Sequence, residues 1–409
     1  MRRSSAAMSD PVLTVVGMRI LHTSDWHIGR SFHGHSTLDA LRGVLDALTA
    51  QVREHAVDVV VIAGDVFDSA TPAAACYTLL TEVLGELSAT GAQIVVTSGN
   101  HDNAARLGFL SPLLRDGIHV VTDPARVGTP ITLEDNHGPV HFYGIPYLEP
   151  IIVRGVWPGV ELRSQQHAID HAMTLISADR AERGGRSVVV SHCFTAGVEA
   201  TGGVEREIRQ GSLDVVPVSA FDGPDYVALG HIHGRNQLAP HIRYSGAPLH
   251  YSFGEGSKPR GSWLVDLDAS GFASAEWLDL PVPRPLVSLR GTLEELLTEV
   301  AHDAHVDSWV CAILTDPTPQ AEPMRRLQQR FAFCATIQMD PQGRAADDGR
   351  SYRSRVKEAV SDVDLIDTFL DHVRDGERAD DAERELINDV VTARRVLVND
   401  IGENEKVPA

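Results

Sequence analysis

Short aliphatic and β-branched runs alternate with helical patterns over the first 280 residues. A strand is predicted to start at Met18, and apolar residues then recur at helical spacing from Leu38 to Val52 before the strand-like run 58–64. Thr71 and Pro72 are predicted to be the N-cap and first turn of the next helix. Strands alternating with helices predict an α/β fold. Further strands are predicted at 93–99, 187–192, 225–231, 242–246 and 262–268.

This pattern changes at residues 281–285, where three prolines in five residues predict a domain boundary. Residues 286 to about 340 then read as strand, amphipathic helix, strand, helix and strand, which is typical of a compact α+β module. We therefore expect a flexible N-terminal extension or an overcalled start over 1–17, a main domain over 18–282, a small domain over 283–340 and a helical tail over 341–409.

Two apolar stripes at helical spacing mark the tail, with the polar turn RDGERADD between them. Each helix is too short to be stable alone, so its apolar face must be covered by a partner or by the rest of the chain. The stripes are Leu365, Ile366, Phe369, Leu370 and Val373, and Leu386, Ile387, Val390, Val391 and Leu397.

Composition narrows the class of protein. Hydrophobic residues make up 43% and charged residues 22% of the 409 positions, which argues against disorder and fibrous repeats. No apolar run approaches the roughly 20 residues that span a bilayer, and residues 1–17 lack a signal core, so we expect a cytoplasmic protein. The four cysteines form no C-x-x-C pair, so a metal would be held by oxygen and nitrogen.

Metal-ligand side chains follow five of the predicted strands. In an open α/β sheet, the loops at the carboxyl ends of strands converge on one crevice, so these separated segments can meet. Carboxylates, imidazoles and an amide suit manganese, iron or zinc, and seven ligands suit two ions that share a carboxylate. Gly64, Gly99 and Gly230 directly precede ligands, where a sharp turn needs unusual φ or close backbone approach. The clusters are Asp25 and His27; Asp65 and Asp68; Asn100, His101 and Asp102; His192; and His231 and His233.

Taken together, these motifs resemble the signature of the calcineurin-like metallophosphoesterases, D-x-H, G-D, G-N-H-D/E, a lone His and G-H-x-H. The resemblance is closer still to the SbcD-like nuclease subunits of bacteria. It covers about 18–268 in detail and the rest in general layout, and its departures are the first 17 residues and Cys193 after His192. The matching segments are HTSDWHIGR (22–30), VVVIAGDVFD (59–68), SGNHDNAARLGF (98–109), FDGPDYVALGHIHGR (221–235) and RYSGAPLHYSFGE (243–255).

The resemblance implies a two-sheet αββα sandwich with a small capping domain and C-terminal helices. It implies that two divalent ions, with manganese expected, are bridged by Asp65. Such a pair of ions, about 3.5–4 Å apart, activates water and neutralises charge on a phosphodiester. The implied ligands are Asp25, His27 and His233 for one ion, and Asn100, His192 and His231 for the other.

His101 holds the place of a non-ligand histidine in the family pattern. We therefore predict that it protonates the departing sugar oxygen and that Asp102 orients its ring. Asp68 either orients the site or simply caps a turn, and it is left out of the ligands. His33 and His35 are expected to be solvated loop residues. Trp26, Cys76 and Cys334 are expected to be packing residues.

Charge is the main objection to a DNA substrate. Lysine and arginine number 36 against 56 aspartates and glutamates, a net charge of −20, which has the wrong sign for a nucleic-acid binder. The charge around the motif loops can still be positive, because several lysines and arginines flank them. Each of these residues could equally be an ordinary surface salt-bridge partner. The candidate substrate-binding residues are Arg30, Arg106 and Arg235, with Lys258 and Arg260 nearby.

The resemblance also implies a partner and an assembly. SbcD-like subunits act with an SbcC-type ATPase, which would supply duplex-binding surface and receive the C-terminal helices. A heterotetramer with a homodimer of this subunit is implied, with ATP-dependent double-strand exonuclease and single-strand or hairpin endonuclease activity in DNA repair and recombination. The alternative is a phosphodiesterase or phosphatase of the same fold acting on a small or protein substrate, which would have the same catalytic centre. A metal-free scaffold is disfavoured because all seven ligands are present.

Overall fold

The computed structural model describes residues 17–114, 116–195, 215–342, 356–357, 359–374 and 378–404, with side chains as far as 393. Nearly all of the predicted extension 1–17 therefore lies outside the described residues. The chain divides into two compact units after Leu286. Within the described ranges, no helix has the length and apolar character needed to cross a membrane.

Two six-stranded sheets build the first unit. In each sheet four neighbouring strands run parallel, and antiparallel strands complete the edges. The first sheet has the order β16 (Gly271–Asp279), β15 (Gly261–Asp268), β1 (Met18–Thr23), β4 (Val59–Ala63), β5 (Gln93–Thr97) and β6 (Ile118–Val121). The second has the order β13 (Asn236–Ala239), β14 (Ile242–Tyr244), β12 (Tyr226–Gly230), β9 (Arg186–His192), β8 (Gly138–Ile145) and β7 (Ile131–Asp135).

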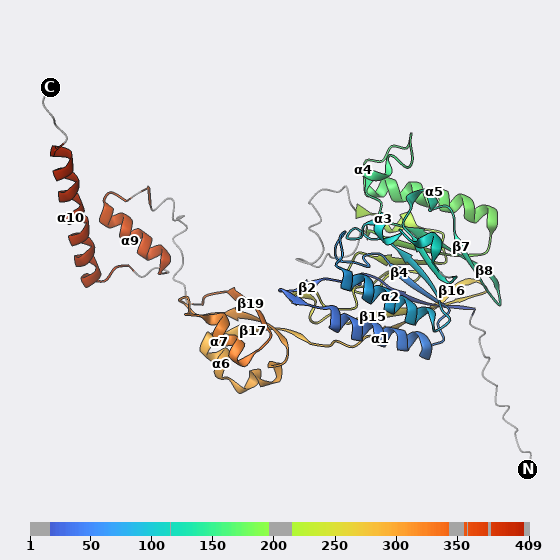
Figure 1. Cartoon of the computed structure of the whole chain (residues 1–409), viewed down its shortest axis with the longest axis horizontal. Helices are drawn as coiled ribbons and strands as arrows, with labels where there is room; N and C mark the ends of the chain where they lie inside the picture. The colour runs from blue at the N-terminus through green and yellow to red at the C-terminus, as the bar shows by residue number, and fades with distance from the viewer. Residues whose placement is uncertain are drawn as a thin grey trace, which may run out of the picture. The chain divides into compact units, whose positions relative to one another are not determined.

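Three apolar layers hold these sheets and their helices together. Along β4, Val59 and Val61 face the second sheet, whereas Val60 and Ile62 face the helices on the other side. Side chains alternate across a strand, so a strand buried on both faces reads as an unbroken apolar run. The αββα sandwich is thereby confirmed (Figure 1), with α1 (Leu38–Glu54) and α2 (Ala74–Ser88) outside one sheet and α5 (Gln165–Arg183) outside the other.

One predicted helix start is wrong. The helix α2 begins at Ala74 with Ala73 in the N-cap position. The backbone N–H of Thr71 instead donates to Ser69 Oγ at 3.2 Å, so Thr71 and Pro72 belong to the preceding turn. Short elements complete the unit: β2 (Ser31–Phe32), β3 (His35–Ser36), α3 (Ala104–Leu107), α4 (Pro150–Val153), β10 (Phe194–Thr195), β11 (Val215–Val216) and the 3-10 turns Ser111–Leu113, Pro124–Arg126, Val218–Phe221 and Phe253–Glu255.

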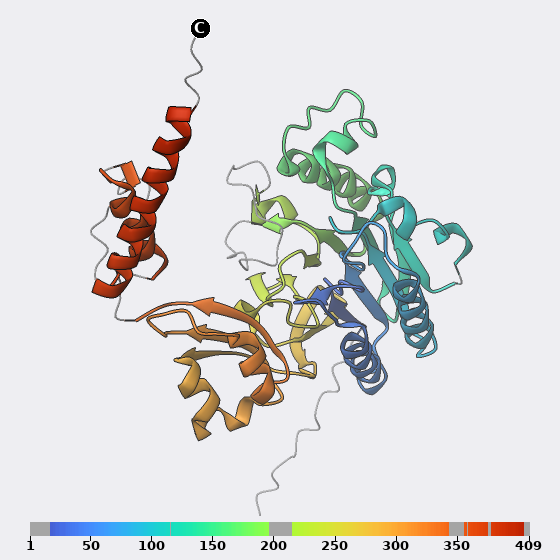
Figure 2. The same cartoon turned by 60° about the vertical axis from the view of Figure 1, so that its left-hand side comes forward.

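The second unit contains a three-stranded sheet with helices on one face (Figure 2). Thr292 caps the first helix reciprocally with Glu295, and this helix ends at Thr298. Leu296, Val310 and Phe331 lie in the shared core. The elements are β17 (Leu286–Gly291), α6 (Leu293–Thr298), the 3-10 turn Val300–His305, β18 (Trp309–Leu314), α7 (Pro323–Arg330) and β19 (Cys334–Met339).

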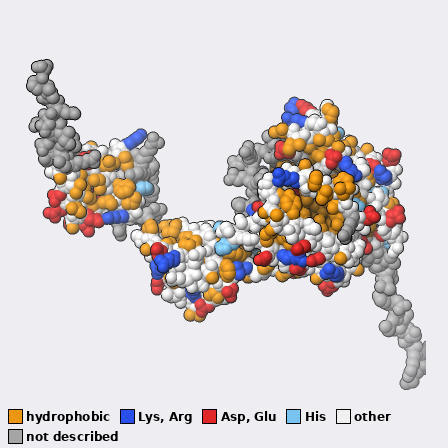
Figure 3. Space-filling model, in the orientation of Figure 1, with side chains coloured by type: hydrophobic (Ala, Val, Ile, Leu, Met, Phe, Trp, Pro, Cys, Tyr) orange, Lys and Arg blue, Asp and Glu red, His pale blue; other side chains and the backbone are white. Residues whose placement is uncertain are grey.

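Helices α9 (Asp362–Val373) and α10 (Asp381–Asn404) follow in the same unit. Arg374 joins them through paired hydrogen bonds of 2.8 and 2.9 Å to Glu383. Hydrophobic side chains gather over these helices (Figure 3), and several of them are exposed: Leu365, Phe369, Val373, Leu386 and Val390. The side chain of Leu397, in the second predicted stripe, lies outside the described residues.

Candidate metal centre

All seven predicted ligands lie just beyond, or at the last residue of, strands that belong to the parallel part of each sheet. Residues Asp25 and His27 follow β1, Asp65 follows β4, and Asn100 follows β5. In the second sheet, His192 ends β9, while His231 and His233 follow β12. The two sheets face each other across a common core, so both sets of strand ends reach one place.

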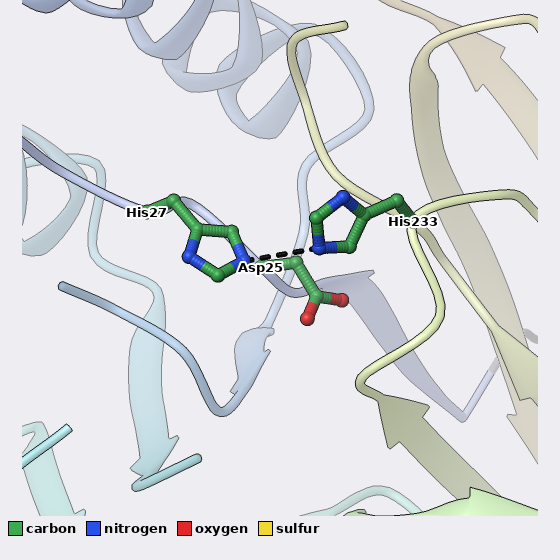
Figure 4. Close-up of side chains that lie close together, drawn as sticks. All are labelled: Asp25, His27 and His233. Carbon is green, nitrogen blue, oxygen red and sulfur yellow. Dashed lines mark hydrogen bonds between the residues drawn. The ribbon is translucent and has the colours of Figure 1, made fainter. Parts of the chain in front are cut away.

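The first set consists of Asp25, His27 and His233, all at most 2% exposed (Figure 4). Their imidazoles meet through the Nε2 atoms, which are 3.1 Å apart. The opposite Nδ1 atoms of His27 and His233 lie 3.2 and 3.5 Å from carboxylate oxygens of Asp68 and Glu255. With the ring protons on Nδ1, facing these carboxylates, both Nε2 lone pairs are directed at the gap between the rings and can bind a cation.

The second set consists of Asn100, His192 and His231. The Oδ1 atom of Asn100 lies 3.0 Å from His192 Nε2 and 3.0 Å from His231 Nδ1. These two ring nitrogens are 3.3 Å apart. The far nitrogen of His192 donates to the carbonyl oxygen of Ala63 at 2.9 Å, which leaves Nε2 for a metal ion.

Asp65 lies between the two sets. Its Oδ2 atom is 3.6 Å from His27 Nε2 and 3.4 Å from His192 Nε2, while its Oδ1 atom accepts the backbone N–H of His101 at 2.8 Å. One carboxylate thus faces a histidine of each set. This is the position that a bridging ligand must occupy.

The pKa values of the buried ligands also suit the binding of cations. Burial lowers the pKa of His27 to about 4 and that of His231 to about 3, so both imidazoles are neutral ligands near pH 7. Burial alone would lower the pKa of His192, but the carboxylates of Asp65 and Asp25 raise it to about 9. Burial would raise the pKa of Asp65, yet His192 and His27 hold it well below its ordinary value. The donor set fits two divalent ions that share Asp65.

The backbone at the centre is strained in a way that the sequence analysis did not anticipate. Asp25, His27, Asp65 and His231 have positive φ angles of 53°, 46°, 49° and 107°. Such conformations are uncommon outside glycine and cluster at functional sites. Each of these residues is a predicted ligand. The strained backbone therefore occurs at the positions whose side chains must point toward the metal site.

Close packing explains the three motif glycines. Gly64 combines a φ of +79° with a site where a Cβ would lie 2.4 Å from His192 Nδ1. At Gly99 and Gly230 the φ is ordinary, and space alone excludes a side chain: a Cβ would lie 2.1 Å from Asp65 Oδ1 and 1.8 Å from the carbonyl oxygen of Ala63.

His101 lies at the edge of the first set, with its ring 4.8 Å from that of His27. Its Nδ1 donates to the backbone carbonyl of Asp68 at 2.9 Å. The prediction that Asp102 orients this ring is wrong. The Asp102 carboxylate instead accepts the backbone N–H groups of Val66, Phe67 and Gly99 at 3.1, 2.9 and 2.9 Å. Asp102 therefore ties the β4 and β5 loops together.

Asp68 contributes more than a simple cap. Its carboxylate lies 3.2 Å from His27 Nδ1 and accepts a hydrogen bond of 3.0 Å from Arg30 Nη1. Glu255, which the sequence analysis did not single out, is fully buried beside His233. Glu255 does lie in the matching segment 243–255, which could have drawn attention to it. A match of segments does not show, however, which side chain Glu255 contacts.

The candidate substrate arginines separate into different environments. Arg30 is held internally by Asp68 and stacks 5.0 Å over the Tyr251 ring, whereas Arg106 is exposed on α3. The Arg235 guanidinium is exposed and lies 5.0 Å over the Trp277 ring. Arg260 was wrongly placed beside a phosphate path: it is 2% exposed and donates to the carbonyls of His233 and Ala247.

The packing residues behave as predicted. Trp26 is fully buried in the core on the α1 side of the first sheet, and its Nε1 donates to Thr23 Oγ1 at 3.0 Å. All four cysteines are buried and free. His33 and His35 are exposed, and the ring of His33 contacts Phe253.

Family comparisons cover both units. A family model described as calcineurin-like phosphoesterase matches residues 18–235, and one described as type 5 capsule protein repressor C-terminal domain matches residues 282–374. Curated relatives include the SbcD subunits of the nuclease SbcCD from Escherichia coli strain K12 and from Escherichia coli O157:H7. Each is 32% identical over 294 residues, which cover 69% of this chain and 73% of the relative.

Similar solved structures include TT1561 of Thermus thermophilus, with a TM-score of 0.37 and 14% identity over 64% of this chain and 99% of that one. Another is a dimetal phosphatase from Danio rerio, with a TM-score of 0.39 and 12% identity over 65% of this chain and all of that one. Likeness at this level carries no weight for function.

Proposed function

Because this chain belongs to the calcineurin-like phosphoesterase family, and its relatives include the SbcD subunit of the nuclease SbcCD, we propose that it is a metal-dependent DNA nuclease subunit. It hydrolyses DNA phosphodiesters at a centre of two divalent ions. Asp25, His27 and His233 would hold one ion, Asn100, His192 and His231 would hold the other, and Asp65 would be shared by both.

The position of Asp65 carries this proposal. A carboxylate within 3.6 Å of a histidine from each set supports a two-ion centre over two unrelated sites. Two ions bound by these residues would supply an activated water and would neutralise the charge that develops on the phosphate. Manganese is the proposed metal, since buried imidazoles with carboxylate and amide oxygens and without cysteine suit it.

His101 supplies the remaining proton transfer. With Nδ1 fixed by the Asp68 carbonyl, its Nε2 is the atom that can hand a proton to the departing sugar oxygen. The Asp68 carboxylate also orients His27, so this one residue positions both a ligand and the acid. Asp102 acts indirectly, by holding the loops that present Asp65 and Asn100.

The substrate is DNA, despite a net charge of −20. Arg106 and Arg235 are exposed near the ligand loops and can contact phosphates, whereas Arg30 is a positioning residue because Asp68 and Tyr251 hold it. An SbcC-type ATPase supplies further duplex-binding surface. The assembly is a heterotetramer that contains a homodimer of this subunit, and the apolar faces of α9 and α10 contact the ATPase.

Manganese-dependent cleavage of end-labelled duplex and hairpin DNA tests the function. The wild type should cleave both substrates, and addition of the ATPase and ATP should increase the rate. Asp65→Asn should abolish cleavage, since it removes the shared charge while asparagine tolerates the positive φ at this position. The matched control is Asp170→Asn on the exposed face of α5, which should cleave at the wild-type rate.

Two results would contradict the proposal. Cleavage that survives Asp65→Asn would show that the activity comes from elsewhere. A metal-loaded wild type that hydrolyses bis(p-nitrophenyl) phosphate but no DNA would favour a phosphodiesterase of the same fold with a small substrate.

A further inference from the structure

A cavity of about 540 Å³ adjoins the second ligand set. Asn100 and His231 belong both to its lining and to that set. Its volume falls within the roughly 300–1,000 Å³ of small-molecule pockets. A group in this cavity would lie next to a phosphate held at the metal centre.

Flat aromatic rings line the cavity where it meets the ligands. Tyr147 lies edge-on to His192, with ring centroids 6.3 Å apart, and Phe194 lies edge-on to His231 at 6.4 Å. Ile152 and Val153 of α4 add apolar surface. Walls of this kind favour a flat, uncharged ring as the occupant.

Gln165, the first residue of α5, lines the same cavity and is only 2% exposed. Its side-chain Nε2 has no hydrogen-bond partner among the described residues. Buried amides are normally satisfied, so an unpaired one at a cavity wall points to a ligand that accepts a hydrogen bond. Glutamine amides pair well with the polar edges of nucleobases.

The charged residues that line the cavity disfavour a second phosphate there. The described lining contains the acidic residues Asp102 and Glu149 and includes no lysine or arginine. The carboxylate of Asp102 is already engaged by three backbone N–H groups. The cavity therefore favours a neutral group with hydrogen-bonding edges.

We propose that this cavity binds one unpaired nucleobase of the substrate, next to the phosphate that is cleaved. The base stacks against Tyr147 and Phe194, and Gln165 contacts its polar edge. This inference rests on the proposed nuclease function. It assigns a role to the cavity in selecting strands whose bases are free to turn outward, such as hairpin loops and frayed ends.

Single abasic substitutions in a hairpin oligonucleotide test the inference. Removing the base at one position beside the cleaved phosphate should lower the wild-type kcat/KM about tenfold, because stacking on aromatic side chains contributes at that level. The ratio of kcat/KM for the intact hairpin to kcat/KM for the abasic hairpin should fall toward one in Gln165→Leu and Phe194→Ala. Gln166→Leu, on the same helical turn but outside the cavity lining, should keep the wild-type ratio. Because each ratio is measured within one variant, a loss of folded protein cancels.

The outcomes separate this inference from the function on which it rests. If the wild type cleaves the hairpin and no abasic position matters, or Gln165→Leu keeps the full ratio, the base site is refuted and the nuclease stands. If no DNA is cleaved, the base site is tested by comparing how strongly dAMP and deoxyribose 5-phosphate inhibit hydrolysis of bis(p-nitrophenyl) phosphate. Stronger inhibition by dAMP that Gln165→Leu removes would support the base site, and equal inhibition would overturn it.

Discussion

At the residue scale, the centre combines polar ligands with backbone conformations that unfolded chains avoid. Each left-handed residue costs on the order of 1–3 kcal/mol, so Asp25, His27, Asp65 and His231 together represent a substantial local strain. Aspartate, asparagine and histidine tolerate this region better than most side chains. The residue types at these positions therefore satisfy the backbone as well as the chemistry.

Glycine substitution offers a test at this scale. Gly99→Ala should lower the free energy of unfolding by about 1–3 kcal/mol and weaken manganese binding, because the new Cβ would lie 2.1 Å from Asp65 Oδ1. Gly43→Ala, in open space on α1, should raise stability by about 0.5–1 kcal/mol. Urea unfolding and manganese titration measure both effects. Equal behaviour of the two variants would contradict the packing argument.

The proton-transfer role of His101 makes a separate prediction. His101→Asn should bind manganese normally yet slow DNA cleavage about 10²- to 10⁴-fold, the range for loss of a general acid. Hydrolysis of bis(p-nitrophenyl) phosphate should slow much less, because p-nitrophenolate departs without a proton. A loss of the same size on both substrates would instead point to disturbed ligands.

At the element scale, one histidine joins the two sheets. The Nε2 of His22 on β1 donates to the carbonyl of Leu229 on β12 at 3.1 Å, and its Nδ1 accepts the Tyr226 hydroxyl at 2.9 Å. Burial lowers the pKa of His22 to about 3. Since the neutral ring fills both roles, protonation would break the link between the sheets.

The His22 link predicts a pH dependence of stability. The pKa is lowered in the folded protein, so the stabilisation is present above the unfolded value of about 6.5 and is lost as pH falls toward 3. Between pH 7 and 5 this residue should account for a loss of about 2 kcal/mol. His22→Gln should show a loss smaller by that amount in urea unfolding at the two pH values. Parallel losses in both proteins would refute the assignment.

Sequence pattern predicted the strands and the ligand-bearing turns because both are local. The run 58–64 marks a doubly buried strand, and Asp65 follows directly. Pattern could not identify partners that are distant in the chain: Asp102 reaches Val66 across 36 positions, and Arg260 contacts His233 and Glu255 inside the fold. Because Arg260 lies close to a motif in the sequence, its positive charge suggested a phosphate contact. In the structure, Arg260 is instead part of a buried hydrogen-bond network.

At the scale of the whole molecule, a net charge of −20 opposes DNA binding, so we expect the proposed ATPase partner to contribute DNA affinity. Phe369 is 50% exposed on α9, within the apolar face proposed to contact the ATPase. Phe369→Asp should weaken a pull-down of the SbcC-type ATPase at least tenfold while manganese-dependent hydrolysis of bis(p-nitrophenyl) phosphate persists. Val360→Asp, at a 94% exposed position outside both helices, is the control. Unchanged capture by both variants would assign the apolar face to another role.

The two histidines that face each other in the first ligand set are 206 positions apart. On a ribosome that adds about 5–20 residues per second, roughly 10–40 s separate the emergence of His27 from that of His233. A nascent chain that stops before β12 has only part of each ligand set. The ligand sets for both proposed ions are thus completed only after β12 has been synthesised, so a chain that ends before this strand lacks His231 and His233.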